Sequence, residues 1–140
     1  NGSPPSELYT TMMTNLGDVI YYGSIGELIE PKYISNFGMQ LKLHSEFALK
    51  NYYNIYFDNS IRDNIFLPYS CKINDKYYIV PQEFCNNYVG SIVVYGESVS
   101  ECIRKVEKCL SKVDGIGLET NIERAKYFIE EILIKDKNFY

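Results

Sequence analysis

The sequence lacks the features by which several protein classes are recognised. No apolar run approaches the roughly 20 residues that a membrane-spanning helix needs, so we expect no membrane partner. Tryptophan is absent, and the four cysteines never stand in the C-x-x-C spacing of a zinc or redox site. We therefore predict free, buried thiols in a reducing, cytoplasmic compartment. The hydrophobic content of 46% excludes a wholly disordered chain.

Basic residues are also outnumbered: the sequence has 14 lysines and arginines and 18 aspartates and glutamates, which gives a net charge of −4. A nucleic-acid surface needs lysines and arginines clustered on one face. The one basic cluster, Arg104, Lys105, Lys108 and Lys112, falls on a single predicted helix that also carries glutamates. We interpret this cluster as a solvent-exposed helix face and expect no nucleic-acid partner.

The 140 residues suffice for one compact domain, spanning 1–140, with a single core. Apolar periodicity predicts a helix at 8–22, a half-buried strand at 39–43, a helical turn at 45–50, strands at 55–57, 64–73, 77–80 and 91–95, a helix at 99–113, and a last helix beginning near residue 120. The pattern indicates an α+β fold, with an antiparallel sheet or small barrel in the middle, a helix at the N-terminus and two at the C-terminus.

Local signals sharpen several of these boundaries. Ser98 with Glu101, and Thr120 with Glu123, have the spacing of a capping box at the start of a helix. The pair at 74–75, Asn-Asp, separates two apolar runs and predicts a tight hairpin. Within 64–73, Pro68 cannot donate a backbone hydrogen bond, so we expect an edge or a bulge there.

The chain offers few groups for catalysis. Glu27, Glu30, Asp58 and Asp63 stand in predicted loops, where carboxylates can act on a substrate or hold Mg²⁺, but their spacing does not distinguish them from a solvated acidic surface. The only histidine, His44, follows an apolar strand without an identified nucleophile or metal partner. We assign no catalytic residue and no metal ligand, and retain His44 as a substrate-binding candidate.

The first residues form a second candidate region. In Asn-Gly-Ser-Pro-Pro-Ser-Glu, backbone amides at the start of the predicted helix would point toward an anion. We therefore add Gly2, Ser3 and Ser6 to the substrate-binding candidates.

Several segments resemble one enzyme family in the order in which they occur. Val89 to Gly96 reads as an apolar strand with a glycine stop, Ser98 to Val113 as a capped helix, and Asp114-Gly-Ile-Gly117 as a glycine turn. This succession resembles the C-terminal segment of ATP-grasp ligases of the phosphoribosylamine-glycine ligase and biotin carboxylase type. Leu67 to Val80 resembles the strand pair of the family's C-terminal domain. Asn1 to Leu8 resembles the end of the passage that binds metal and ATP.

The resemblance implies an enzyme that uses ATP and Mg²⁺ to activate a carboxylate as an acyl phosphate and then passes it to an amine. The acidic pair, the ATP-facing lysine and the first-turn arginine of such enzymes are not recognisable here. We therefore expect a C-terminal fragment of a longer ligase, which shapes the substrate cleft, packs on the missing ATP-binding domain of the same chain, and is inactive without it. We expect this fragment to bind no cofactor and to be a monomer or weak homodimer. The alternative is a stand-alone protein-interaction module that binds through a strand edge or the tyrosine-rich loops.

Overall fold

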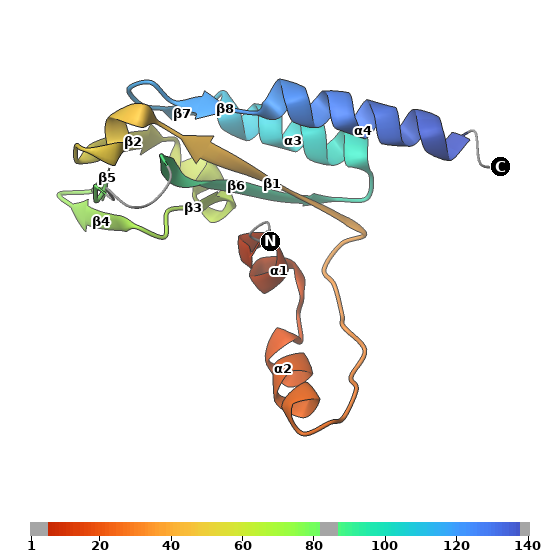
Figure 1. The fold of residues 1–140 in the computed structure, drawn as a ribbon. Helices are drawn as coiled ribbons and strands as arrows, with labels where there is room; N and C mark the ends of the chain where they lie inside the picture. Colours follow the sequence, from red (N-terminus) through yellow and green to blue (C-terminus); the bar gives the residue numbers. More distant parts are fainter. Residues whose placement is uncertain (1–5, 82–86, 138–140) are drawn as a thin grey trace. The chain divides into compact units, whose positions relative to one another are not determined.

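The computed structural model describes residues 6–81 and 87–137, and it contains both helices and strands (Figure 1). The helices are α1 (Ser6–Met12), α2 (Leu16–Ser24), α3 (Val99–Leu110) and α4 (Ile122–Lys137), with 3-10 turns η1 (Glu46–Leu49) and η2 (Asn59–Asn64). The strands are β1 (Phe37–His44), β2 (Tyr53–Phe57), β3 (Ile65–Phe66), β4 (Ser70–Ile73), β5 (Lys76–Ile79), β6 (Tyr88–Gly96), β7 (Val113–Asp114) and β8 (Glu119–Thr120).

The strands form two four-stranded sheets, in the orders β3-β6-β1-β8 and β4-β5-β2-β7. The pairs β1 with β8, β2 with β5, β3 with β6 and β4 with β5 are all antiparallel. Helices precede the sheets at the N-terminus and follow them at the C-terminus. The predicted α+β class, with its antiparallel sheet and terminal helices, is confirmed.

The chain divides into two compact units. The first unit comprises Asn1–Gln40, Phe57–Phe66 and Ser91–Val113, and the second comprises Leu41–Tyr56, Leu67–Gly90 and Asp114–Tyr140. Each unit has its own buried apolar residues, described below.

The core of the first unit is built on β6 and α3. Ile92, Val93 and Val94 of β6 are almost completely buried, as the apolar run predicted. α3 is amphipathic and buries Cys102, Val106 and Cys109. Full burial of one such aliphatic side chain stabilises the fold by roughly 1.5–3 kcal/mol, so these two elements supply much of the unit's stability.

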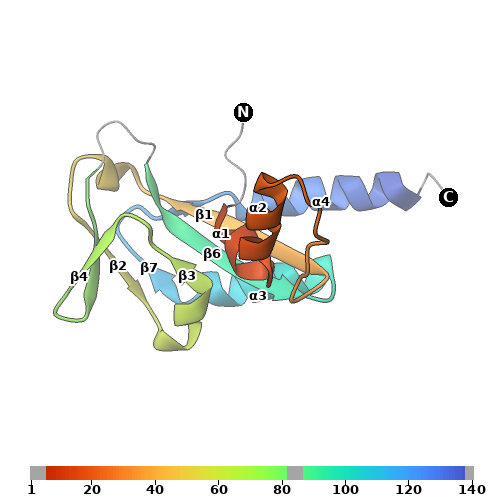
Figure 2. The same cartoon turned by 90° about the horizontal axis from the view of Figure 1, so that it is seen from below.

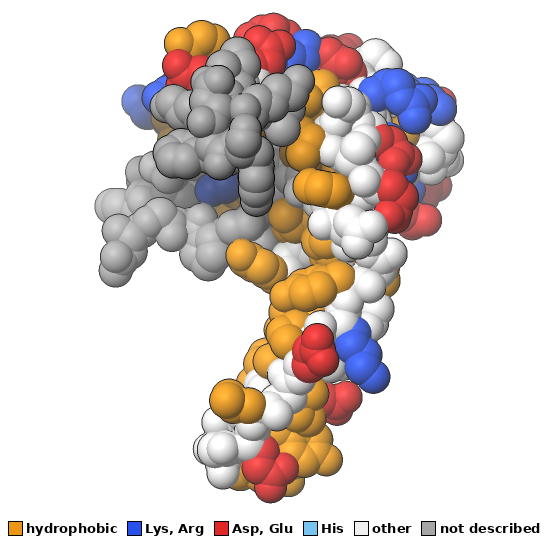
Figure 3. All heavy atoms as spheres, turned by 90° about the vertical axis from the view of Figure 1, so that its right-hand side faces the viewer, with side chains coloured by type: hydrophobic (Ala, Val, Ile, Leu, Met, Phe, Trp, Pro, Cys, Tyr) orange, Lys and Arg blue, Asp and Glu red, His pale blue; other side chains and the backbone are white. Residues whose placement is uncertain are grey.

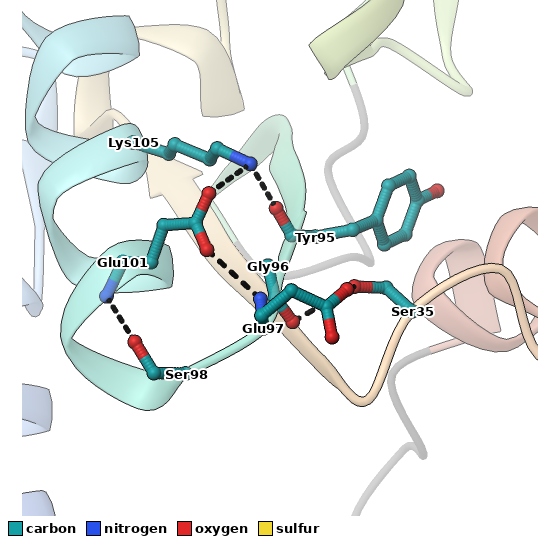
Figure 4. A network of polar contacts seen from close by, with 7 residues as sticks. All are labelled: Ser35, Tyr95, Gly96, Glu97, Ser98, Glu101 and Lys105. Atoms are coloured by element: carbon teal, nitrogen blue, oxygen red, sulfur yellow. Dashed lines mark hydrogen bonds and ion pairs between the residues drawn. The ribbon is translucent and has the colours of Figure 1, made fainter.

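The start of α3 has the predicted capping box, with one difference (Figure 4). The Ser98 hydroxyl accepts a hydrogen bond from the Glu101 backbone N-H at 3.2 Å. In return, the Glu101 carboxylate accepts from the backbone N-H of Glu97, one residue before the cap, at 2.9 Å. Two donors at the helix start are therefore satisfied by side chains.

The basic face of α3 differs from the prediction. Arg104 is exposed, as expected for a solvent-facing residue. Lys105 is half-buried, and its ammonium donates to the Tyr95 carbonyl oxygen at 2.6 Å and pairs with Glu101 at 2.8 Å (Figure 4). The interpretation of these basic residues as one solvent-exposed face therefore does not describe Lys105, which is half-buried and whose ammonium is already paired.

The predicted N-terminal helix at 8–22 is interrupted. α1 ends at Met12 and α2 starts at Leu16, because the intervening residues pair with a returning segment: Met13 bridges Tyr33, and the Thr14 backbone N-H donates to the Lys32 carbonyl oxygen at 2.8 Å. The Asn15 side chain donates to the Glu30 carbonyl oxygen at 3.0 Å and accepts from the Lys32 backbone N-H at 2.7 Å. The apolar repeat of this segment does not mark a buried face in α2, since none of the residues of α2, all of which the structure describes, is buried.

The predicted strand at 64–73 is two strands, β3 and β4, which belong to different sheets. Pro68 stands in the break, where its missing N-H prevents a continuous ladder. The predicted hairpin follows, and Figure 2 shows it at the left of the view. Asn74 and Asp75 have φ values of 48° and 62°, the positive values that a two-residue type I′ turn requires.

The last helices also differ from their predicted boundaries. α3 ends at Leu110 rather than at 113, and the chain continues into β7. Thr120 lies in β8 and is not the cap of α4, since the Ala125 backbone N-H donates to the Asn121 carbonyl oxygen at 2.9 Å. The Thr120 capping-box prediction was wrong because β8 extends through that residue.

The core of the second unit contains a large aromatic side chain, Tyr53 of β2, which is fully buried. A Cβ atom at Gly115 would lie 1.9 Å from the Tyr53 hydroxyl oxygen, so only glycine fits there. Burial raises the pKa of Tyr53 to about 12, although the nearby Ser45 hydroxyl acts to lower it. The Ser45 hydroxyl itself donates to the Ile116 carbonyl oxygen at 2.8 Å. The Tyr53 hydroxyl makes no well-formed hydrogen bond among the described residues.

Within residues 6–81 and 87–137, no helix combines the length and the apolar character needed to cross a membrane.

Candidate functional site

A small polar cavity surrounds His44 in the second unit. Its volume is about 230 Å³, and it is lined by His44, Asn87, Glu119, Thr120 and Asn121. All five side chains can donate or accept hydrogen bonds. The cavity therefore has the chemistry of a site for a small polar group.

Strand pairing places two of these side chains together. β1 and β8 are antiparallel, with His44 opposite Glu119 and Leu43 opposite Thr120. Directly opposed residues in an antiparallel pair project from the same face of the sheet, so His44 and Glu119 are neighbours. Leu43 is fully buried, and since side chains alternate along a strand, His44 projects from the face opposite to the one that buries Leu43.

A chain of hydrogen bonds fixes the His44 ring. Its Nδ1 lies 3.0 Å from Asn87 Oδ1, and the amide nitrogen of Asn87 donates to Glu46 Oε1 at 2.5 Å. Because Glu46 requires the Asn87 nitrogen, the amide oxygen is the atom that faces His44, and Nδ1 must carry the hydrogen. In the neutral ring, Nε2 is then the nitrogen that accepts a hydrogen bond.

The position of Asn87 is itself held by the backbone. The Ser45 N-H donates to the Asn87 carbonyl oxygen at 2.7 Å, next to the His44 contact. The Tyr88 ring packs edge-on against the His44 ring, with centroids 6.1 Å apart. The imidazole is therefore oriented by contacts with the 87–88 segment before any ligand arrives.

The cavity can bind a ligand by hydrogen bonds and charge. Among the residues that the structure describes, its lining offers one imidazole, one carboxylate, one hydroxyl and two amides, and no thiol, amine or activated hydroxyl that would act as a nucleophile. In the part of the chain that the structure describes, no group of three or more His, Cys, Asp or Glu side chains is arranged to hold a metal ion. Its volume lies below the usual 300–1,000 Å³ of small-molecule pockets, so it would hold one polar end of a substrate.

A larger hollow of about 600 Å³ belongs to the first unit. It is lined by Tyr9, Met12, Tyr33, Ile34, Ser35, Asn36 and Glu97. The Glu97 carboxylate accepts from the Ser35 hydroxyl at 3.0 Å and from the Asn36 amide at 2.6 Å (Figure 4 shows the Ser35 side). The Ser35 hydroxyl also donates to the Gly96 carbonyl oxygen at 2.8 Å, and together these contacts attach the 35–36 segment to the start of α3.

The predicted substrate-binding residues have different outcomes. His44 lies in a polar cavity, whereas Gly2 and Ser3 fall outside the described residues. Ser6 is the first residue of α1. Ser6 belongs to the first unit and His44 to the second, so their participation in one site stays a prediction.

Among the acidic loop residues, Asp58 makes a defined structural contact. Asp58 caps η2 by accepting from the Ser60 backbone N-H at 2.7 Å. Hydrogen bonds from Ser60, and to a smaller degree the Lys112 charge, hold the pKa of the Asp58 carboxyl below its usual value. This carboxylate therefore has a structural role at the start of the turn.

The sequence did not single out Asn87, Glu119 or Asn121. Glu119 lies in the two-residue strand β8, and Asn121 directly precedes α4. Such short segments leave no periodic pattern in the sequence. The single local signal was the polar run Glu-Thr-Asn at 119–121 between a glycine turn and an apolar helix.

Comparisons with known proteins identify a fold but not a family. No family model matches the chain, and no curated protein matches it by sequence. Nine solved chains match it in structure. Among them is a crystal structure of phosphoribosylamine-glycine ligase from Thermotoga maritima, with a TM-score of 0.62 and 20% identity. The match covers 84% of this chain and 29% of that ligase chain, and at this identity it shows a distant ligase-like fold alone.

Proposed function

We propose that this chain is the C-terminal domain of an ATP-dependent carboxylate-amine ligase-like enzyme of the ATP-grasp type. Its role is to shape the substrate cleft and to pack on the ATP-binding domain. The observation that carries the proposal is the ligase-like fold, which extends over 84% of the chain. Since the match spans 29% of the neighbouring enzyme, the ATP-binding part of such an enzyme would lie outside these 140 residues.

The chemistry of the His44 cavity supports a role in substrate binding. The Glu119 carboxylate can attract an amine in its protonated form, and the Asn87 and Asn121 amides can bind polar groups. His44, held by Asn87, offers a hydrogen-bond acceptor in a fixed orientation. These groups would bind and orient a substrate.

The phosphoryl chemistry of the reaction would come from ATP. When bound, ATP with Mg²⁺ would supply the phosphoryl group that activates the carboxylate for attack by the amine. We expect the groups that bind ATP and Mg²⁺ to lie on the ATP-binding domain of the enzyme. We therefore assign this chain no part in phosphoryl transfer.

Exposed apolar side chains near the N-terminus support packing on another domain. None of the residues of α2 is buried, and Leu28 in the following loop is 99% exposed. Figure 3 shows orange side chains gathered along this segment, at the bottom of the view. The large exposed side chains there are Tyr9, Ile20, Tyr21, Ile25, Leu28, Tyr33 and Ile34. Exposed apolar surface of this kind marks interaction sites. We propose that the ATP-binding domain covers this surface in the whole enzyme, and that a second copy of the chain can cover it in a weak homodimer.

The test is a ligase assay on the full product of the gene that contains this chain. ADP release should require a carboxylate and an amine together, supplied from a panel of amino acids with phosphoribosylamine or ammonia. His44→Asn and Glu119→Gln should raise KM for the amine or the carboxylate about tenfold, and leave KM for ATP within about twofold. Asp63→Asn, an exposed carboxylate of η2, is the matched control and should change neither constant.

Two results would contradict the proposal. One is a folded full-length protein that releases no ADP with any member of the panel. The other is calorimetric binding of Mg-ATP to the 140-residue chain at about micromolar concentration, because it would place the nucleotide site within this domain.

A further inference from the structure

The first unit contains a second polar cavity, distinct in its residues from the His44 cavity. It has a volume of about 340 Å³ and lies among α3, η2 and the end of β6. Its polar lining comprises Ser60, Asn64, Lys105, Lys108 and Lys112. The three lysines are spaced by three and four residues, so they recur on one side of the helix and of its C-terminal extension.

The three ammonium groups differ in what they contact. Lys105 is paired with Glu101 and donates to the Tyr95 carbonyl oxygen. Lys112 donates to the Ser60 hydroxyl at 2.6 Å. The Lys108 ammonium has no hydrogen bond or ion pair with any residue that the structure describes. Lys108 therefore carries a charge that no described residue pairs with, and the charge of Lys112, which also acts on the Asp58 carboxylate, faces the same cavity.

The charges of these two lysines act inside the cavity. Cys109, which also lines it, is buried, and burial raises the pKa of its thiol. The charges of Lys112 and Lys108 act in the opposite direction on the same thiol. Cys109, Lys108 and Lys112 line the same cavity, so an anion bound there would lie close to both ammonium groups.

We propose that this cavity binds the phosphate group of a small phosphate monoester. Lysine ammoniums are common phosphate ligands, because they are compact charges that donate strongly to phosphate oxygens. The volume is at the lower end of the range for small-molecule pockets, which suits one phosphorylated molecule of low mass.

A nucleic acid fits these observations less well. Its phosphate backbone needs a continuous basic surface, whereas α3 carries Glu101 and Glu107 among its lysines. The whole chain also has a net charge of −4, which repels a polyanion beyond the cavity.

The experiment is calorimetric titration of the 140-residue chain with inorganic phosphate and with ribose 5-phosphate. We expect saturable binding of both, tighter for the ester, and weaker at high salt because screening reduces the attraction. Lys108→Gln and Lys112→Gln should each weaken binding about tenfold. Arg104→Gln removes the same charge from the exposed side of α3, and should change the affinity by less than about twofold. Equal melting temperatures of the variants will show that the fold is kept.

Three outcomes would overturn the inference. The first is no saturable binding of either probe up to about 10 mM. The second is an equal loss in Arg104→Gln and Lys108→Gln, which would indicate a diffuse charge effect. The third is displacement of ribose 5-phosphate by a short oligonucleotide that binds more tightly, which would identify the ligand as nucleic acid. The inference does not depend on the proposed ligase function, since the two cavities share no residue and the probes contain no ATP, amine or carboxylate substrate.

Discussion

Gly115→Ala should destabilise the protein through a single contact, and Tyr53→Phe should relieve part of the loss. The added Cβ would lie 1.9 Å from the Tyr53 hydroxyl oxygen, 2.6 Å from Cζ and 3.1 Å from Cε1. The Tyr53 ring is fully buried and cannot swing into solvent, so the backbone at Gly115 must move. Overpacking of this kind costs about 1–3 kcal/mol, and a contact this short belongs at the upper end.

Removal of the Tyr53 hydroxyl takes away the closest of these contacts. The double variant should recover about 1 kcal/mol relative to the sum of the single losses, while the Cζ contact keeps the rescue incomplete. Tyr53→Phe alone should change the unfolding free energy by less than about 1 kcal/mol, because the hydroxyl is buried without a well-formed hydrogen bond among the described residues.

Urea denaturation followed by circular dichroism measures all four proteins of this cycle, with the slope of free energy against urea as the check on two-state behaviour. Gly23→Ala in α2 is the control, because a Cβ there meets nothing within 4 Å. It should stabilise the helix by about 0.5–1 kcal/mol. Strictly additive losses in the Gly115 and Tyr53 variants would refute the steric argument, as would a Gly115→Ala loss below about 0.5 kcal/mol.

Three further predictions follow from buried or capping side chains. Burial raises the pKa of Tyr53 from 10.0 to about 12, so the neutral phenol contributes stability that is present below pH 10 and is lost as the pH rises toward 12. The urea midpoint at alkaline pH should therefore fall less for Tyr53→Phe than for wild type. Val106→Asp puts a charge at a fully buried site and should abolish cooperative unfolding, whereas Arg104→Asp, at an exposed site, should shift the urea midpoint slightly. Equal losses of stability would mean that the side of α3 assigned here as buried is not the buried one. Ser98→Ala should lower the unfolding free energy, measured by urea denaturation, by about 1 kcal/mol. Thr120→Ala removes no helix cap and should lower it less. A larger loss for Thr120→Ala would contradict the cap assignment.

Elements with strong periodicity were predictable because their signal is local. The alternation at 39–43 gave β1, the apolar run at 91–95 gave β6, and the Ser98 capping box gave the start of α3. The break between α1 and α2 was not predictable in this way. It depends on hydrogen bonds from Asn15 to a segment 15 and 17 residues away, and an apolar repeat carries no trace of them.

The candidate sites likewise combine residues that the sequence could indicate with residues that only the fold brings close to them. His44 could be singled out by its residue type, but Asn87 and Glu119 reach it only through strand pairing and a return of the chain. The spacing of Lys105, Lys108 and Lys112 indicated one side of a helix, although α3 ends at Leu110 and Lys112 lies beyond it. It could not predict that η2 residues such as Ser60 would lie against that face and enclose a cavity, since that requires contacts across 52 residues.

The labelling rate of the buried thiols of α3 can report how often the first unit opens. Burial raises the pKa of both Cys102 and Cys109, and the thiolate is the form that reacts with alkylating reagents. Their labelling must therefore wait until the helix detaches, whereas the half-buried Cys71 of β4 belongs to the second unit. Mass spectrometry of cysteine-containing peptides at successive times would then record how often each unit opens, and whether the two open together or independently.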